Sequence, residues 1–295
     1  MASWRSRRRR PRPAGPGRAP DLIAVGAQAC GVPWWIGLIA EHPRILAPDD
    51  GGEGAGFFDA FSQREMTDAD VAAYHARFAR PDGWLAADWG TRYLADAWTA
   101  PLIARAAPDA KLLVLLRDPV ERYLAILRQR LREAVDPDEP ILMTDMINRG
   151  RYATQLRALR AFVDPQRILV LQYERCRADV LGEYRRTIRF LGLPDDGFVP
   201  RRLRRAARGK TGPRAYVRAL RAAGLPEHVN RRWLRTSVRR LLRGRRLELP
   251  REPWPELDAA LHAVLDPEVE ALRELVPELD LSLWPHFAHL DGLKG

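Results

Sequence analysis

The sequence predicts an α/β fold with a central parallel sheet flanked by helices. Three short apolar stretches, at residues 22–25, 111–116 and 167–172, have the length and composition of buried strands. Helical patterns separate them, which is typical of parallel strands joined by crossover helices and covered on both faces. The chain has 295 residues, 46% of them hydrophobic, enough for one large domain with a proper core.

The elements follow one another in a regular order. The first strand leads through a glycine turn into a helix expected at residues 33–41, where Pro33 takes a first-turn position that proline favours. Residues 47–65, rich in Gly and Asp, are expected to form a loop. Further helices are expected at residues 97–107, 120–134, 148–162 and 179–191. Ligands of such sheets bind beyond the carboxyl ends of the strands, so we expect functional residues at those ends.

The stretch VGAQACGVPWW spans the first strand end. Gly26 and Gly31 have the spacing of a phosphate loop. Backbone N–H groups in such a turn, helped by the dipole of the following helix, bind phosphate without any side chain. The loop contains no Lys, and no Ser or Thr begins the helix. An ordinary strand–helix connection is therefore the alternative interpretation.

Arg117 directly follows the second apolar strand and precedes Asp118-Pro119. A guanidinium at the end of a strand is well placed for bidentate contact with a phosphate. The alternative is an arginine paired with Asp118 or Glu121. The sequence alone leaves both interpretations open.

Charge is unevenly distributed along the chain. The net charge is +11, yet residues 1–20 carry +7 and residues 201–251 carry +16, which leaves −12 for the rest. We expect residues 1–20 to be a disordered basic tail, dispensable for folding, and residues 21–295 to form one domain. The two basic segments are solvated surface in one interpretation. In the other they attach the protein to nucleic acid or an anionic membrane, and residues 201–251 alternatively form a surface for a sulfated or phosphorylated glycan.

Cysteine and histidine usage suggests neither a disulfide framework nor a metal site. Two cysteines, Cys30 and Cys176, suit a reducing compartment, so we expect a cytoplasmic protein, with the basic segments allowing peripheral attachment to a membrane. The histidines are too scattered to predict metal ligands. No apolar run reaches the roughly 18–20 residues of a membrane-spanning helix. The abundance of Arg and Ala is typical of GC-rich bacterial genomes.

Several motifs resemble the sulfotransferases that use 3′-phosphoadenosine-5′-phosphosulfate (PAPS), of the bacterial and glycan-directed type. LLVLLRDPVERYLA is similar to that family's strand, arginine and 3′-phosphate-binding helix. ILVLQYERCRADVLGEYRRTIRFLGLP resembles the next strand and helix, and GWLAADWGTRYLADAWTAPLIARAAPDAKLL resembles the segment with the catalytic carboxylate. LDPEVEALRELVPELDLSLWPHF resembles the C-terminal ending, so the likeness runs from residue 22 to residue 287.

The resemblance implies a P-loop-like sulfotransferase fold with PAPS as co-substrate. The reaction would transfer sulfate to a hydroxyl or amine, and we expect a carbohydrate acceptor. Asp88 takes the position of the family's catalytic acid, where it would act as a base toward the acceptor. A loop carboxylate is the alternative interpretation of Asp88. The residues expected to bind the nucleotide are Gly26, Gln28, Gly31 and Arg117, with Lys210 and Arg214 of the late loop GKTGPR.

The departures from the family pattern matter as much as the matches. Ala29 stands at the position of the loop lysine, and Ala125 at that of the 3′-phosphate serine. The loop's hydroxyl positions hold Cys30, Val32 and Pro33. Loss of a cation placed at developing charge typically costs about 3–4 kcal/mol of barrier. Two further hypotheses follow: a catalytically inactive sulfotransferase-like binding protein, and a basic protein that interacts with nucleic acid or anionic membrane.

Overall fold

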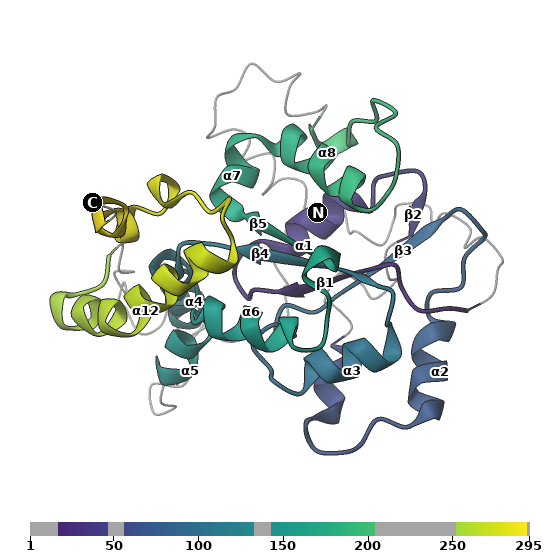
Figure 1. The fold of residues 1–295 in the computed structure, drawn as a ribbon, viewed down its shortest axis with the longest axis horizontal. Helices are drawn as coiled ribbons and strands as arrows, with labels where there is room; N and C mark the ends of the chain where they lie inside the picture. The colour runs from purple at the N-terminus through teal and green to yellow at the C-terminus, as the bar shows by residue number, and fades with distance from the viewer. Residues whose placement is uncertain (1–16, 47–55, 133–142, 204–251, 294–295) are drawn as a thin grey trace, which may run out of the picture.

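The computed structural model of the chain describes residues 17–46, 56–132, 143–203 and 252–293. A five-stranded parallel sheet lies at its centre, in the order β2-β3-β1-β4-β5 (Figure 1). The strands are β1 (Leu22–Gly26), β2 (Ile45–Leu46), β3 (Leu85–Trp89), β4 (Lys111–Leu116) and β5 (Ile168–Gln172). The predicted fold class is confirmed, and the three predicted strands are the adjacent β1, β4 and β5.

Helices connect the strands in an alternating order. The α-helices are α1 (Val32–Ile39), α2 (Asp68–Ala76), α3 (Thr99–Ala106), α4 (Pro119–Arg132), α5 (Met143–Asn148), α6 (Tyr152–Arg160), α7 (Tyr173–Ala178), α8 (Val180–Phe190) and α12 (Pro255–Leu275). Short 3-10 segments are η2 (Phe57–Ser62), η3 (Pro165–Arg167), η4 (Leu281–Leu283) and η5 (Pro285–Leu293). The five expected helices correspond to α1, α3, α4, α6 and α8. Among the described helices, none is both long enough and apolar enough to cross a bilayer.

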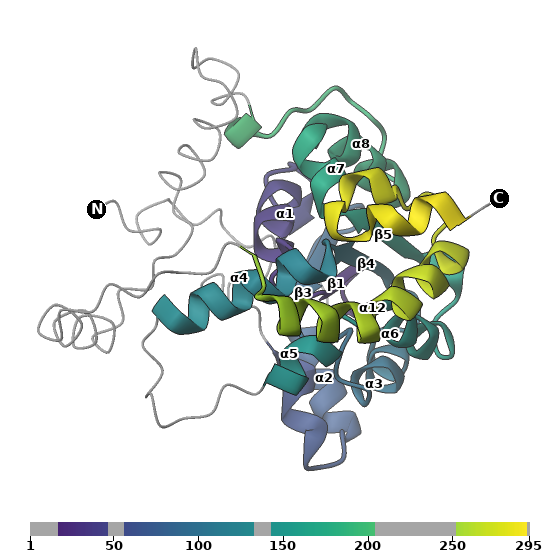
Figure 2. The ribbon, with the colours of Figure 1, turned by 90° about the vertical axis from the view of Figure 1, so that its left-hand side faces the viewer.

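The helices cover both faces of the sheet. α1 packs on β1 and β3, and α7 and α8 pack on β5, on one face (Figure 1). α3 and α6 lie on the opposite face, and α12 packs against α6 (Figures 1 and 2). Because both faces are covered, β4 is buried from residue 112 to residue 116 and reads as a continuous apolar run.

The third family-like segment contains a strand that the sequence did not predict. Residues 85–89 form β3 beside β1, with Asp88 in register with Ile23. The interpretation of Asp88 as a loop carboxylate is therefore wrong. A charged residue in the middle of LAADW weakens the apolar signal on which strand prediction depends. The expected loop at 47–65 is corrected as well, since η2 occupies residues 57–62, while residues 47–55 lie outside the described part of the chain.

The end of the expected basic tail packs on the domain. The side chain of Arg80 is 1% exposed and forms an ion pair with Asp21 at 2.7 Å. Its guanidinium also donates to the backbone carbonyls of Arg18, at 3.2 Å, and Ala19, at 2.6 Å. Residues 17–20 thus supply acceptors to a buried cation. Residues 1–16 and 204–251, with most of the basic charge, lie outside the described residues.

Candidate functional site

The carboxyl ends of β1, β4 and β5 meet at one edge of the sheet. Gly26 ends β1, Arg117 follows β4, and Tyr173 follows β5. After β1 the chain continues to β2, at the edge beyond β3. After β4 it continues to β5, in the opposite direction along the sheet. Such a reversal creates a crevice in which α/β proteins bind ligands. The structure therefore brings the glycine loop and Arg117 to the edge where the sequence predicted them.

Both loop glycines are required by their surroundings. Gly26 has a φ of 145° and Gly31 a φ of 90°, conformations that favour glycine. A Cβ on Gly31 would lie 2.8 Å from the ring of Tyr173. Gly31 is the N-cap of α1, and Pro33 occupies the first turn of this helix. The turn is thus a tight strand–helix connection whose helix begins at the site.

Cys30 connects the glycine loop to the core beneath the site. Its thiol is fully buried and lies 3.4 Å from the hydroxyl of Tyr152, which donates to the backbone carbonyl of Arg117 at 3.0 Å. Burial raises the pKa of the Cys30 thiol to about 11, so the group stays protonated at neutral pH. Cys30 therefore links the loop to the start of α4 and offers no nucleophile. Gln28 is half-buried beside it, and its carbonyl faces the Cys30 sulfur at 3.6 Å.

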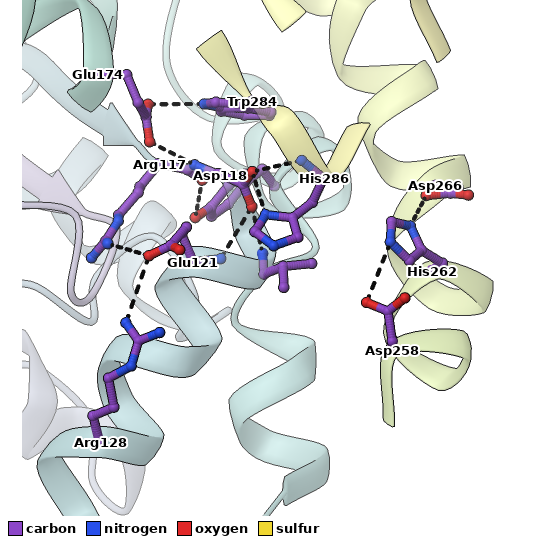
Figure 3. Close-up of polar contacts among 12 residues, drawn as sticks. Arg117, Asp118, Glu121, Arg128, Glu174, Asp258, His262, Asp266, Trp284 and His286 are labelled. Carbon is purple, nitrogen blue, oxygen red and sulfur yellow. Dashed lines mark hydrogen bonds and ion pairs between the residues drawn. The ribbon is translucent and has the colours of Figure 1, made fainter. Parts of the chain in front are cut away.

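Two guanidinium groups converge on one carboxylate oxygen. Arg117 Nη2 lies 2.8 Å from Oε2 of Glu121, and Arg128 Nη1 lies 3.7 Å from the same oxygen (Figure 3). The guanidinium of Arg117 also lies over the ring of Tyr173, 5.3 Å from its centroid. Of the two partners left open by the sequence, Arg117 is paired with Glu121.

Arg128 was not among the predicted site residues. It is seven residues after Glu121 on α4, with Ala125 four residues after Glu121, so all three share one face of the helix. The i, i+4, i+7 spacing of Glu121, Ala125 and Arg128 is the sequence signal that places Arg128 on the same helix face as Glu121. Arg128 thus places a second cation beside the position where the related family has a serine.

A network of side chains fixes the turn that carries Arg117. Asp118 Oδ1 accepts from the backbone N–H groups of Val120, at 2.9 Å, and Glu121, at 3.1 Å, in the manner of a helix N-cap. Glu174 Oε1 accepts from the Asp118 N–H at 3.1 Å, and its Oε2 accepts from Trp284 Nε1 at 2.9 Å (Figure 3). The C-terminal segment therefore holds the turn through Glu174.

His286 completes this network from η5. Its Nδ1 lies 2.9 Å from Oδ2 of Asp118, a carboxylate that is 1% exposed (Figure 3). The hydrogen bond to Asp118 raises the pKa of His286 above its ordinary value, because the buried carboxylate favours the charged imidazolium. Burial raises the pKa of Glu174. His286 is thus paired with the carboxylate next to Arg117, and this pairing favours its charged form.

Asp88 lies on the other side of β1 from Arg117, beneath an aromatic cover. Its side chain is fully buried, and Tyr74 donates its hydroxyl hydrogen to Oδ2 at 2.7 Å. Burial and the neighbouring carboxylate raise the pKa of Tyr74 well above its ordinary value. Phe57 stacks on Tyr74 with ring centroids 4.4 Å apart. In this arrangement the Tyr74 hydroxyl takes the place at Asp88 that an acceptor hydroxyl would need.

Two remaining residues expected to bind the nucleotide, and four tryptophans of the neighbouring segments, complete the description of the site. Lys210 and Arg214 lie outside the described residues. Trp35 and Trp89 are buried in the core, whereas Trp34 is half-buried and its ring meets that of Tyr173 edge-on at 6.1 Å. Trp84 precedes β3 and so lies at the amino edge of the sheet, away from the site. Trp34 is therefore the tryptophan of these four that borders the site.

Comparison with known proteins points to one family. The model of a family described as the sulfotransferase family matches residues 41–197, more than half of the chain. The matched region contains β3, β4, α4 and β5 and therefore includes Arg117 and Glu121. No curated protein sequence matches the chain.

One solved structure has a similar fold, and two others match less well. A sulfotransferase from Alicyclobacillus acidocaldarius matches with a TM-score of 0.57 at 22% identity, covering 90% of this chain and 98% of that chain. The sulfotransferase domain from the curacin biosynthetic pathway matches with a TM-score of 0.43 at 12% identity, covering 63% of this chain and 76% of that chain. A mouse sulfotransferase, SULT7A1, in complex with PAP matches with a TM-score of 0.42 at 12% identity, covering 62% of each chain. At these identities the likeness concerns the fold alone.

Proposed function

Because this chain belongs to the sulfotransferase family, we propose that it binds PAPS at the crevice between β1 and β4 and transfers the sulfuryl group to a hydroxyl or amine. A carbohydrate is the acceptor class that we expect. The observation that carries the proposal is the convergence of Arg117 and Arg128 on one anionic oxygen of Glu121. Two guanidiniums around one oxygen form a site for a phosphate, for which the Glu121 carboxylate stands in.

The two ends of the nucleotide would be bound differently. The 3′-phosphate displaces the Glu121 carboxylate and takes up Arg117 and Arg128. The 5′-phosphosulfate lies at the Gly26–Gly31 loop, where the start of α1, which has no side-chain cap, offers its first N–H groups. Tyr173 lies between these two parts, since it contacts both Gly31 and Arg117. Lys210 and Arg214 supply additional positive charge in this proposal.

Transfer makes demands that binding does not. The sulfur–oxygen bond to the 5′-phosphate breaks, a bond from sulfur to the acceptor oxygen or nitrogen forms, and the acceptor proton goes to a base. For Asp88 to be that base, an acceptor hydroxyl must replace the Tyr74 hydroxyl at Oδ2. This exchange requires the aromatic cover of Phe57 and Tyr74 to move.

A second candidate function is nucleotide binding without transfer. Two observations favour it: Ala29 stands at the position of the loop lysine, and Asp88 is fully buried on Tyr74. The first removes a cation that acts on the reacting atoms, and the second keeps a base away from them. Neither affects the convergence of Arg117 and Arg128.

One experiment separates the two functions. The full chain is incubated with PAPS and a panel of hydroxyl and amine acceptors, and formation of 3′,5′-adenosine bisphosphate (PAP) is followed. Acceptor-dependent PAP formation that is lost in Asp88→Asn supports transfer. Saturable PAP binding without any PAP formation supports the binding protein. No binding of either nucleotide would overturn both.

A further inference from the structure

A second group of titratable side chains lies where α12 meets η5, outside the phosphate site. Asp266 bridges two histidines: its Oδ1 lies 2.8 Å from Nδ1 of His262, and its Oδ2 lies 3.0 Å from Nε2 of His289. His262 and Asp266 are one turn apart on α12, whereas His289 comes from η5. Figure 3 shows His262 between the carboxylates of Asp258 and Asp266.

We propose that His262, Asp266 and His289 bind a divalent transition-metal ion, of which Zn²⁺ is the best match. One ligand atom from each residue lies within 4.8 Å of the other two. Two imidazole nitrogens and one carboxylate are a donor set that Zn²⁺ prefers, with water completing an open coordination shell. With metal–ligand distances of about 2.0–2.2 Å, tetrahedral ligand atoms lie roughly 3.4 Å apart. The distances from Asp266 to the two histidine nitrogens, 2.8 and 3.0 Å, therefore need to lengthen only slightly.

The surroundings favour a site for an ion. His262 and Asp266 are half-buried and His289 is exposed, so a hydrated ion can enter. Nε2 of His262 lies 3.7 Å from Oδ1 of Asp258, on the side of the ring away from Asp266. A carboxylate on this side of the ring favours metal binding electrostatically, and it orients the imidazole once the ring nitrogen comes within hydrogen-bond distance. The ring of Phe287 packs near both histidines, with centroid distances of 5.5 Å to His262 and 6.4 Å to His289.

A bound ion would tie η5 to α12. His289 is three residues after His286, which holds Asp118 beside Arg117. The ion therefore stabilises the segment that fixes the arginine turn. The inference does not depend on the proposed function, because it rests on side chains that take no part in nucleotide binding.

The test is calorimetric titration of the full, untagged chain with ZnCl₂ at neutral pH, together with the melting temperature. We expect one ion per chain and a rise in melting temperature, because the ion binds the folded state preferentially. His262→Ala and His289→Ala should each weaken Zn²⁺ binding by more than about a hundredfold, and Asp258→Asn by about tenfold. His75→Ala, which removes a half-buried imidazole on α2 that is hydrogen-bonded to the Ala106 carbonyl, is the matched control and should leave Zn²⁺ binding unchanged.

Three results would overturn the inference: no saturable binding by the unmodified chain, unchanged binding in both His262→Ala and His289→Ala, or an equal loss in His75→Ala. Circular dichroism of each variant checks that the fold is retained. His289 is the safest replacement in this respect, since half of its side chain is exposed.

Discussion

Arg117 already holds a carboxylate from the helix that follows it, since its Nη2 lies 2.8 Å from Oε2 of Glu121. A phosphate that binds Arg117 must therefore displace Glu121, and the affinity measured for a nucleotide includes the cost of that exchange. The same oxygen lies 3.7 Å from Arg128. When the phosphate displaces the carboxylate, it can therefore pair with both guanidinium groups. Glu121 thus acts as an internal competitor of the proposed ligand.

The first prediction concerns this competitor. Glu121→Gln removes the competing charge and leaves both arginines in place, so PAP should bind more tightly. The expected gain is up to about fivefold, since a partly exposed ion pair contributes up to about 1 kcal/mol. Calorimetry measures the dissociation constant, with Glu183→Gln on α8 as a control that removes an acid paired with Arg186 instead of Arg117. Unchanged or weaker PAP binding in Glu121→Gln would show that the phosphate does not use this oxygen's position.

The second prediction concerns pH. The pKa of His286 is raised by Asp118, so the contact stabilises the fold fully below the ordinary pKa of 6.5. This stabilisation is lost as the pH rises through the raised pKa, where the imidazolium loses its proton. The difference in melting temperature between the unmodified chain and His286→Asn should be largest in mildly acidic buffer and should shrink above neutral pH.

His286→Asn keeps a hydrogen-bond donor to Asp118 and does not titrate, and His286→Ala removes the donor as well. We expect the Ala variant to lose PAP affinity and the Asn variant to retain most of it at neutral pH, because the donor keeps the arginine turn in place. A difference in melting temperature that does not vary with pH would contradict the assignment of the charge to His286.

The third prediction concerns the loop. Ala29 already has a φ of 64°, so Ala29→Lys requires no new backbone conformation there. A lysine at this position should tighten PAPS binding by about tenfold or more, the range of a charged hydrogen bond. Ala29→Gln, similar in length and uncharged, is the control. Equal affinities of the Lys and Gln variants would mean that the loop does not face the phosphosulfate.

Restoring a loop hydroxyl should have a different effect. Val32 is fully buried, so Val32→Thr places a hydroxyl in the core. We expect a loss of about 1–3 kcal/mol in the free energy of unfolding, measured by denaturant titration. A Val32→Thr variant as stable as the unmodified chain would indicate that this hydroxyl finds a partner in the loop.

The fourth prediction concerns the chain before β1. Deletion of residues 1–16 should leave the melting temperature nearly unchanged. Deletion of residues 1–20 removes two carbonyl acceptors from the buried guanidinium of Arg80 and should cost about 1–3 kcal/mol of stability. Thermal unfolding of the two truncated chains compares them directly. Equal melting temperatures would show that Asp21 and the Phe78 carbonyl together satisfy Arg80.

The sequence predicted the part of the fold that depends on local apolar pattern. β1, β4 and β5 are short buried runs, so their strand character and their common edge followed directly. β3 was missed because Asp88 interrupts its apolar run, and the buried hydrogen bond from Tyr74 that accommodates this carboxylate joins residues 14 apart in sequence. No local pattern carries that information.

The positions of the expected site residues in the fold were predicted to the same extent. Gly26, Gly31 and Arg117 share one edge as expected, because the topology of a parallel sheet decides their position. The contacts of Glu174 with Trp284 and of Asp118 with His286 bring together residues more than 100 positions apart, which depends on how α12 returns to α6. The grouping of His262 and Asp266 with His289 depends on the same return of the chain.

The most direct test of the central claim is a double-mutant cycle on Arg117 and Arg128, with PAP affinity measured by calorimetry. Arg117→Ala should cost about 1.5–3 kcal/mol of binding, the range for a charged hydrogen bond. Arg128→Ala should also weaken binding, and the double variant should deviate from additivity because both guanidiniums contact one phosphate. Arg157→Ala, an exposed arginine on α6, serves as the matched control. Saturable PAP binding with these losses would support the phosphate site, whereas PAP binding that is absent or unchanged in Arg117→Ala and Arg128→Ala would contradict it.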